Sequence, residues 1–380
     1  MTPGDPEWRA HRLDQLLTFA RRARTDTGFG WLLDDGTVDA TRPEALWINA
    51  RMTYVWSLVG DHELAAHGVA ALRNRFADPE RGGWFDEIGA DAPVDHAKRC
   101  YGHDFVLLAA AAAARAGVAG ADVLLSEAES IHLMHFWDPA AGRCVEEWNS
   151  DWTRLEDYRG ANSNMHAVEA YLAAARATGD DAWTDRALLI CERIIGVTAR
   201  EHDWRVVEHF GADWTARPDL NRDRPDDPFR PFGATPGHGL EWARLLIEVR
   251  AALSQPREWL LGAAEALFER AVADALDDDT ALLPYTTDWD GTPVVAERFH
   301  WVMAEAVSAA ETLAAVTDRP LYRGLADRWW AEIDEHLIAD DGSWRHELSP
   351  ALEPSTRTWA GRPDAYHAVN ALTLPDRMMG

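Results

Sequence analysis

The sequence predicts an all-α fold, an (α/α)6 barrel of six helical hairpins with short β-hairpin links on one rim. Three observations lead to this prediction. Helix–turn–helix patterns recur along the 380 residues at intervals of roughly 50–70 residues, a spacing typical of repeat architectures. Short glycine- and aromatic-rich segments separate these patterns. Histidines recur near the starts of alanine- and leucine-rich stretches, at His103, His166, His238, His300 and His367.

Five helical hairpins can be delimited, over residues 45–76, 103–136, 164–195, 238–276 and 301–338. In the third hairpin, Met165, Val168, Leu172 and Ala175 form an apolar stripe at helical spacing, as in an amphipathic helix. A sixth hairpin would pair a helix around 7–24 with one around 364–372 and close a ring. Because no Pro/Ser-rich linker divides the chain, we expect a single catalytic domain over 1–380. An open helical solenoid is the alternative architecture.

The links between hairpins alternate polar and apolar residues, which predicts short strands. They cover residues 81–89, 142–152, 204–214, 282–291 and 342–349. Many of the 19 tryptophans lie in or near these links. Aromatic rings in loops suit the apolar faces of sugar rings, and they suit ordinary packing equally well. The tryptophans therefore suggest a carbohydrate site without establishing one.

Composition excludes several classes of partner. A formal net charge of −27 argues against nucleic acid and anionic membranes, which need basic surfaces. The sequence has no apolar run long enough to span a membrane and no N-terminal apolar signal region, so we expect a cytoplasmic protein. Cys100, Cys144 and Cys191 lack metal-ligand spacing and are expected to be buried, reduced thiols. The Asp277–Asp279 run is expected to be a solvated turn.

Polar side chains lie near the start of the first helix of each hairpin. Helix starts offer free backbone N–H groups and positive potential, which favour polar ligand groups. A single histidine there is more often a hydrogen-bonded core residue than a functional one, but a repeated set favours a shared site. The candidates are Arg51, Tyr101, Asn162, His166, His238, Glu241, Trp301, Glu305 and His367.

His238 is the clearest acid–base candidate, since it follows a Thr-Pro-Gly turn into a helix and has Glu241 on the same face. A carboxylate beside an imidazole increases its basicity and orients it. The same spacing at His166 and Glu169 also permits a metal site built from two such pairs. No nucleophile elbow, phosphate loop or dinucleotide fingerprint is present. Two possible functions therefore remain: an enzyme that uses histidine-mediated proton transfer, and a sugar-binding module without catalysis.

Glycoside hydrolysis by a pair of carboxylates is a further alternative, because it is chemistry that helical barrels support. Glu146, Glu147 and Asp151 are the candidates near one predicted rim. Nothing in their spacing singles them out.

Several segments resemble the N-acylglucosamine 2-epimerase superfamily, and within it the aldose–ketose isomerases. They are TGFGWL (27–32), LWINARM (46–52), YRGANSNMHAVEAYL (158–172), VVEHF (206–210), FRPFGATPGH (229–238), EW (241–242) and DAYHA (364–368). The resemblance spans nearly the whole chain. It implies an (α/α)6 barrel, a site without metal or cofactor, and essential histidines at His238 and His367. It also implies substrate contacts from Arg51, Tyr101, Asn162, His166, Glu241, Trp301 and Glu305.

Three positions at which the sequence differs from a similar branch of the superfamily indicate where the chain belongs. Sulfoquinovose isomerases are similar to this chain but hold the sulfonate with an arginine where Pro228 stands, and with glutamines where His346 and Pro363 stand. A charged head group would lose hydrogen bonds worth roughly 1.5–3 kcal/mol each. We therefore expect a neutral monosaccharide, with interconversion of D-mannose and D-fructose and of D-lyxose and D-xylulose. A cellobiose or mannose 2-epimerase is the alternative, followed by a sulfoquinovose isomerase.

The resemblance also suggests roles. His238, oriented by Glu241, would open the sugar ring and move the proton between O1 and O2. His367 would take the C2 proton to give a cis-enediol, and Arg51 would stabilise the negative charge on its oxygen. The remaining residues would hold hydroxyls or, in the case of Trp301, pack on the carbon face of the sugar.

Overall fold

The computed structural model describes residues 1–276 and 280–379, so the Asp277–Asp279 run lies outside the described residues. Its contacts group into two compact units. Unit 1 comprises Met1–Arg21, Ile194–Glu208 and Arg217–Gly380, and unit 2 comprises Arg22–Arg193 and His209–Ala216. The single domain over 1–380 remains a prediction.

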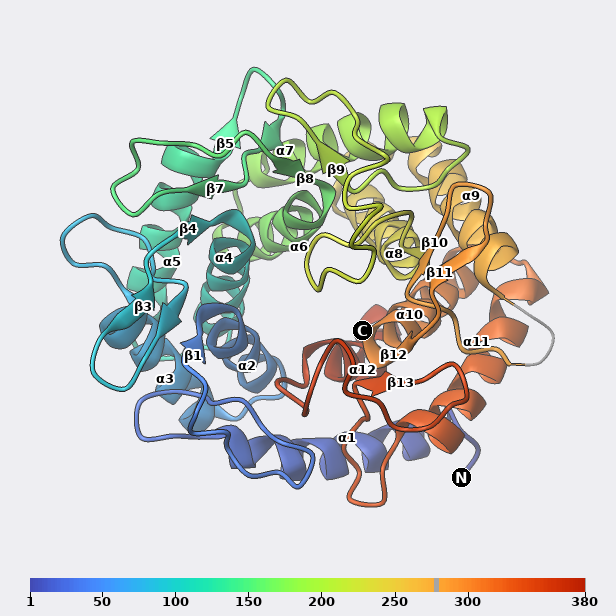
Figure 1. Cartoon of the computed structure of the whole chain (residues 1–380), viewed down its shortest axis with the longest axis horizontal. Coiled ribbons are helices and arrows are strands. Elements are labelled where there is room, and N and C mark those ends of the chain that lie inside the picture. The colour runs from blue at the N-terminus through green and yellow to red at the C-terminus, as the bar shows by residue number, and fades with distance from the viewer. Residues whose placement is uncertain (277–279, 380) are drawn as a thin grey trace. The chain divides into compact units, whose positions relative to one another are not determined.

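Unit 2 contains three of the predicted hairpins. Their first helices, α2 (Leu46–Leu58), α4 (Cys100–Arg115) and α6 (Ala161–Thr178), pack side by side in one row. Each is covered by the helix that follows it, namely α3 (His62–Ala71), α5 (Ala121–Ile131) and α7 (Ala182–Cys191), as Figure 1 shows. These are the hairpins predicted over 45–76, 103–136 and 164–195.

Unit 1 repeats this arrangement. In its row, α10 (His300–Val316) lies between α8 (Pro236–Ala252) and α12 (Tyr366–Met379). The covering helices are α9 (Glu258–Ala275) on α8, α11 (Pro320–Glu332) on α10 and α1 (Pro6–Ala20) on α12. The predicted pairing of the first and last helices of the chain is therefore confirmed. A 3₁₀ turn, η1 (Arg21–Ala23), follows α1.

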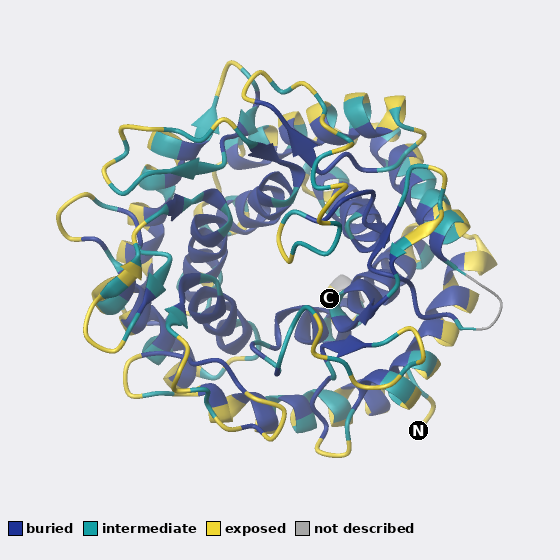
Figure 2. Cartoon of the chain, viewed as in Figure 1, coloured by how far each residue is buried: buried dark blue, intermediate teal, exposed yellow. Residues whose placement is uncertain are grey.

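The two kinds of helix differ in burial, and their sequences explain the difference. The row helices are buried almost all round, whereas the covering helices expose one face (Figure 2). In α4 the run from Phe105 to Ala111 is fully enclosed, and its alanines allow neighbouring helices to approach closely. In α5 only Ala121, Leu124, Leu125 and Ala128 are buried, the spacing of a one-sided amphipathic helix.

The covering helices of four hairpins end in wider π-helical turns, which the sequence patterns did not predict. These turns are η2 (Leu72–Phe76), η3 (His132–Phe136), η4 (Glu192–Ala199) and η5 (Ile333–Leu337). Phe76, Phe136 and Leu337 at the ends of three of them are fully buried. The turns thus begin the link segments with an anchored apolar side chain.

Short antiparallel strands form the links, and only some are local hairpins. The local pairs are β2 (Glu87–Ile88) with β3 (Pro93–Asp95), β5 (Trp137–Asp138) with β6 (Arg143–Cys144), and β10 (Thr286–Thr287) with β11 (Pro293–Val295). Elsewhere the strand before a row helix pairs with the strand after its covering helix. These pairs are β1 (Glu44–Ala45) with β2, β4 (Lys98–Arg99) with β7 (Glu147–Trp148), β8 (Arg159–Gly160) with β9 (His209–Phe210), and β12 (Arg298–Phe299) with β13 (Glu347–Leu348).

Tryptophans of the links hold these segments to the helices. Trp84 donates its indole hydrogen bond to the carbonyl of Leu72, and Trp148 donates to that of His135. Trp289 donates to the carbonyl of Pro218. For these three residues the packing interpretation explains their position. Among the described residues, no helix is long and apolar enough to cross a membrane.

Candidate active site

The predicted site residues occupy a common register, although a different one from that of the five histidines. The second and sixth residues of a row helix lie one turn apart on one face. They are Trp47 and Arg51 in α2, Tyr101 and Phe105 in α4, Asn162 and His166 in α6, Gly237 and Glu241 in α8, Trp301 and Glu305 in α10, with His367 second in α12. His238 is third in α8. The histidine rhythm in the sequence only approximates this register.

The fourth residue of the row helices in unit 2 has a structural role instead. Asn49 accepts a hydrogen bond from the backbone N–H of Phe29 at 2.7 Å and donates to the carbonyls of Phe29 and Ala45. Asn164 makes the same set of bonds to Cys144 and Gly160.

His103 takes this place in α4. Its Nδ1 bonds the Arg99 carbonyl, its Nε2 accepts from Trp84 N–H, and burial holds its pKa well below the ordinary value. His103 is thus a satisfied core histidine.

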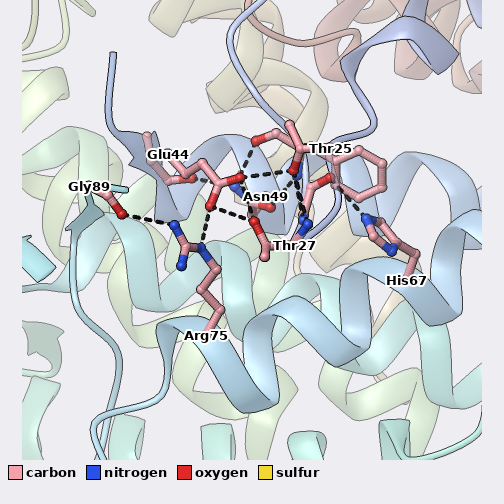
Figure 3. Close-up of polar contacts among 10 residues, drawn as sticks. Thr25, Thr27, Glu44, Asn49, His67, Arg75 and Gly89 are labelled. Carbon is pink, nitrogen blue, oxygen red and sulfur yellow. Dashed lines mark hydrogen bonds and ion pairs between the residues drawn. The ribbon is translucent and has the colours of Figure 1, made fainter. Parts of the chain in front are cut away.

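The TGFG segment (27–30) is held over α2 by a network of polar contacts (Figure 3). The hydroxyls of Thr25 and Thr27 donate to the Glu44 carboxylate at 2.9 and 3.0 Å, and Arg75 donates to the same carboxylate. His67 lies 3.0 Å from the carbonyl of Gly28 through Nε2. These contacts fix the segment that precedes Arg51, and they give its motif residues a structural role.

His238 is oriented by Glu208, which the sequence reasoning missed. Its Nδ1 lies 2.9 Å from Oε1 of Glu208, a carboxylate that is 4% exposed. A carboxylate can only accept hydrogen bonds, so Nδ1 of His238 carries the proton. Its Nε2 is left for proton exchange with a ligand. The expectation that Glu241 orients His238 is wrong. A side chain three residues along the helix meets the ring less directly than one approaching from the preceding link.

His367 has the equivalent partner in Glu305. Its Nδ1 lies 2.9 Å from Oε1 of Glu305, a residue with no exposed surface. The other oxygen of Glu305 accepts from Nε of Arg244 at 3.1 Å. Arg244 also bridges to Glu248 at 2.7 Å and Glu241 at 3.5 Å. One buried guanidinium therefore offsets the charge of the carboxylates behind His367.

Trp301 contacts both histidines. Its ring centroid lies 5.0 Å from that of His238 and 5.8 Å from that of His367. Gly237 makes room for the indole, since a Cβ at this position would lie 2.6 Å from a Trp301 ring carbon. The two acid–base candidates and an aromatic surface are thus assembled within unit 1.

Glu241, Glu305 and His367 also offer ligand atoms within 4.8 Å of one another, the spacing of a metal site. The guanidinium of Arg244 already contacts both carboxylates. A divalent cation would have to compete with this resident charge. The donor set therefore fits an acid–base centre better than a cation site.

Unit 2 holds a second set of predicted residues, built around Arg51. Its Nη2 donates to the hydroxyl of Tyr101 at 2.8 Å. The guanidinium carbon lies 4.3 Å from the ring centroid of Phe105 and 5.1 Å from that of Trp47. Aromatic faces stabilise a cation that is only 6% exposed, and they fix its orientation.

His166 and Asn162 lie on α6, one turn apart. The ring of His166 lies 4.6 Å from that of Phe105 and 5.3 Å from that of Tyr101. Its Nδ1 is 3.8 Å from Glu169, longer than a hydrogen bond. The Asn162 amide oxygen is buried and accepts no hydrogen bond within the described part of the chain. This set is therefore equipped for polar binding.

The carboxylates considered for glycoside hydrolysis are already engaged elsewhere. Glu147 accepts from Arg99 at 2.9 Å, Glu146 accepts from Ser163, and Asp151 accepts from Thr153 in an exposed turn. An acid–nucleophile pair needs one protonated carboxyl group and one free one. The contacts do not support this alternative.

Comparison with known proteins identifies the fold class and then the family. A crystal structure of D-mannose isomerase superposes with a TM-score of 0.93 and 28% identity, over 100% of both chains. The predicted fold class, an all-α (α/α)6 barrel, is thereby confirmed. The chain belongs to the N-acylglucosamine 2-epimerase family, whose model matches residues 28–371, as its motifs indicated.

Two curated relatives are more similar in sequence. The D-mannose isomerase of Thermobifida fusca is 45% identical over 97% of this chain and 93% of its own length. That of Pseudomonas cannabina pv. alisalensis is 42% identical over 98% and 93%. The family thus consists of sugar epimerases and isomerases, and these relatives stand on the isomerase side.

Proposed function

We propose that the chain is an aldose–ketose isomerase that interconverts D-mannose and D-fructose, and by the same chemistry D-lyxose and D-xylulose. One observation carries this proposal: His238 and His367 are each bonded through Nδ1 to a buried carboxylate, and both lie against Trp301. Isomerisation needs two positioned proton-transfer groups, and this arrangement supplies them. The names of the two curated relatives support the sugar.

The first step is opening of the pyranose ring. His238, held by Glu208, protonates the ring oxygen and accepts the proton of the C1 hydroxyl, which releases the open-chain aldehyde. The same Nε2 then moves a proton between O1 and O2. Positioned acid–base groups contribute roughly 10²–10⁴-fold each.

The second step is transfer of the carbon-bound proton. His367, held by Glu305, takes the C2 proton to give the cis-enediol and returns it to C1 to give the ketose. Glu305 uses one oxygen for His367 and the other for Arg244, so its contacts support a positioning role rather than the predicted hydroxyl contact. Trp301 packs on the carbon face of the sugar.

The substrate contacts of Arg51, Tyr101, Asn162, His166 and Glu241 are proposed from the family resemblance. Arg51 would stabilise the enediolate oxygen, and the others would bind hydroxyl groups. We also propose that the reaction needs no metal, from the family resemblance, and that the protein is cytoplasmic, from its sequence.

NMR of the purified protein with D-mannose in D₂O, after treatment with EDTA, tests the proposal. We expect fructose to form, with deuterium at its C1. Glucose as the sole product would make the chain a 2-epimerase. Conversion of sulfoquinovose with none of mannose would assign it to the sulfosugar branch, and absence of any exchange at C2 would refute histidine-mediated isomerisation.

A further inference from the structure

A second cluster of reactive side chains lies in unit 2, among residues that the proposed mechanism does not use. Cys100 is the first residue of α4, His132 the first residue of η3, and Cys144 the last residue of β6. Their sulfur and ring nitrogen atoms lie within 4.8 Å of one another. The exposed surface of these three residues is 1% or less. The fold thus brings two thiols and an imidazole together inside a core.

Asp104 completes a four-donor set. Its Oδ1 lies 2.6 Å from Nε2 of His132 and 3.7 Å from Sγ of Cys100. Its Oδ2 is buried and accepts no hydrogen bond within the residues that the structure describes. Asp104 is 0% exposed. A buried carboxyl oxygen without a partner is costly and calls for a cation or a donor.

The far side of the imidazole is held as metal-ligating histidines commonly are. Nδ1 of His132 lies 3.1 Å from the hydroxyl of Tyr171, which is also 3.2 Å from Sγ of Cys144. When Nδ1 donates to this hydroxyl, the tautomer leaves Nε2 for the metal. Tyr171 is fully buried, so this contact is not shared with bulk water.

We propose that Cys100, Cys144, His132 and Asp104 bind one thiophilic divalent cation of the zinc type. Two thiolates, one imidazole nitrogen and one carboxylate oxygen are a donor set that Zn²⁺ accepts in tetrahedral geometry. On binding, each thiol releases its proton to solvent. The cation also displaces to solvent the proton between Nε2 of His132 and Oδ1 of Asp104, and no oxidation or reduction is involved.

The site is structural, because all four donors are buried and together they would fill a tetrahedral shell. It joins the start of α4, the end of its covering helix and the β5–β6 link. Because the fold brings the donors together from three separate elements, the metal enters as the fold forms. The acid–base centre of unit 1 uses none of these residues, and the metal independence proposed for the reaction is a separate matter.

Metal analysis of the intact protein tests the proposal. The chain is expressed in medium supplemented with Zn²⁺, or with Cd²⁺, and metal is measured after exhaustive dialysis. We expect about one equivalent of Zn²⁺ per chain. The Cd²⁺-loaded protein should show near-ultraviolet thiolate-to-metal charge-transfer absorption.

Cys191→Ser is the matched control, since Cys191 is equally buried but lies on α7 outside the cluster. It should retain the metal and the Cd²⁺ absorption, whereas Cys144→Ser and His132→Asn should lose both. If the cluster variants do not fold, the Cd²⁺ absorption of Cys191→Ser decides the question. Wild-type protein holding less than about a tenth of an equivalent, with no Cd²⁺–thiolate absorption, would overturn the proposal. A Cys100–Cys144 disulfide in freshly purified protein would overturn it as well.

Discussion

The two compact units present their predicted site residues in different chemical settings. In unit 1, His238 and His367 are each hydrogen-bonded to a buried carboxylate. In unit 2, Arg51 lies among aromatic rings, and the ring of His166 packs against those of Phe105 and Tyr101. A histidine bonded to a carboxylate has a fixed tautomer and a stabilised protonated form, as proton transfer requires. A guanidinium packed on rings keeps its charge and direction, as binding or charge stabilisation requires.

The comparison teaches that helix register alone does not assign a role. Glu305 and Arg51 are both sixth residues of their helices, yet Glu305 holds a histidine and Arg51 donates to a phenol. What differs is the partner supplied by neighbouring elements. Removing individual partners should therefore separate proton transfer in unit 1 from charge stabilisation in unit 2.

The largest effect is expected from the histidines themselves. His367→Ala and His238→Ala should each lower kcat by about 10²–10⁴-fold or more, because each removes a proton-transfer group. Proton exchange at C2 in D₂O separates them: His367→Ala should lose exchange even when open-chain sugar is available. His336→Ala, on the surface turn η5, is the control and should retain activity. Substantial turnover in either variant would remove that histidine from its catalytic role.

Arg51→Met should lower kcat by about 10²–10³-fold, the usual loss when one donor to a developing oxyanion is removed. Arg51→Lys keeps the charge but loses the planar contact with Phe105 and the directed bond to Tyr101, so it should recover only part of the activity. Steady-state kinetics distinguishes the roles. A raised KM with unchanged kcat would show that Arg51 contributes only to ground-state binding.

Glu208→Gln should have a smaller effect, lowering kcat by about 10–10²-fold while KM changes little, because it disturbs the orientation of His238 and no sugar contact. Glu241→Gln is the matched comparison. If Glu241 oriented His238, as its spacing suggested, the two variants would behave alike in the ring-opening step. We expect only Glu208→Gln to become limited by ring opening, which a comparison of pyranose substrate with an open-chain analogue would reveal.

The sequence predicted the hairpins well because the signals for them are local: apolar periodicity, glycine turns and polar helix starts. The row helices begin within a few residues of the predicted positions, and the predicted helix starts placed Arg51, Trp301 and His367 near the beginning of their helices. Partners from distant segments could not be predicted. Glu208 lies thirty residues before His238 in a link, and only its VVEHF motif gave a signal.

The cysteines illustrate the same limit. Rules of spacing look for ligands close together in sequence, so Cys100 and Cys144 were predicted to be buried thiols, which they are. Their approach to His132 depends on three elements packing together. Spacing rules cannot detect a donor set of that kind.

We expect the smallest effect from a change at His346 in unit 1, which should alter how stability depends on pH. Burial, with the neighbouring charges of His300 and Arg362, holds the pKa of His346 well below its ordinary value. The ring stacks on His300 at a centroid distance of 3.7 Å. Below about pH 6.5 the unfolded chain binds a proton that the folded chain does not, so stability falls as pH decreases, by at most about 1.4 kcal/mol per pH unit.

His346→Gln removes this titration. Between pH 7 and about pH 5 its melting temperature should therefore fall less than that of the wild type, and calorimetry measures the difference. His11→Gln, on α1 near the surface, is the control and should follow the wild type. Parallel curves for wild type and His346→Gln would mean that His346 is protonated in the folded protein.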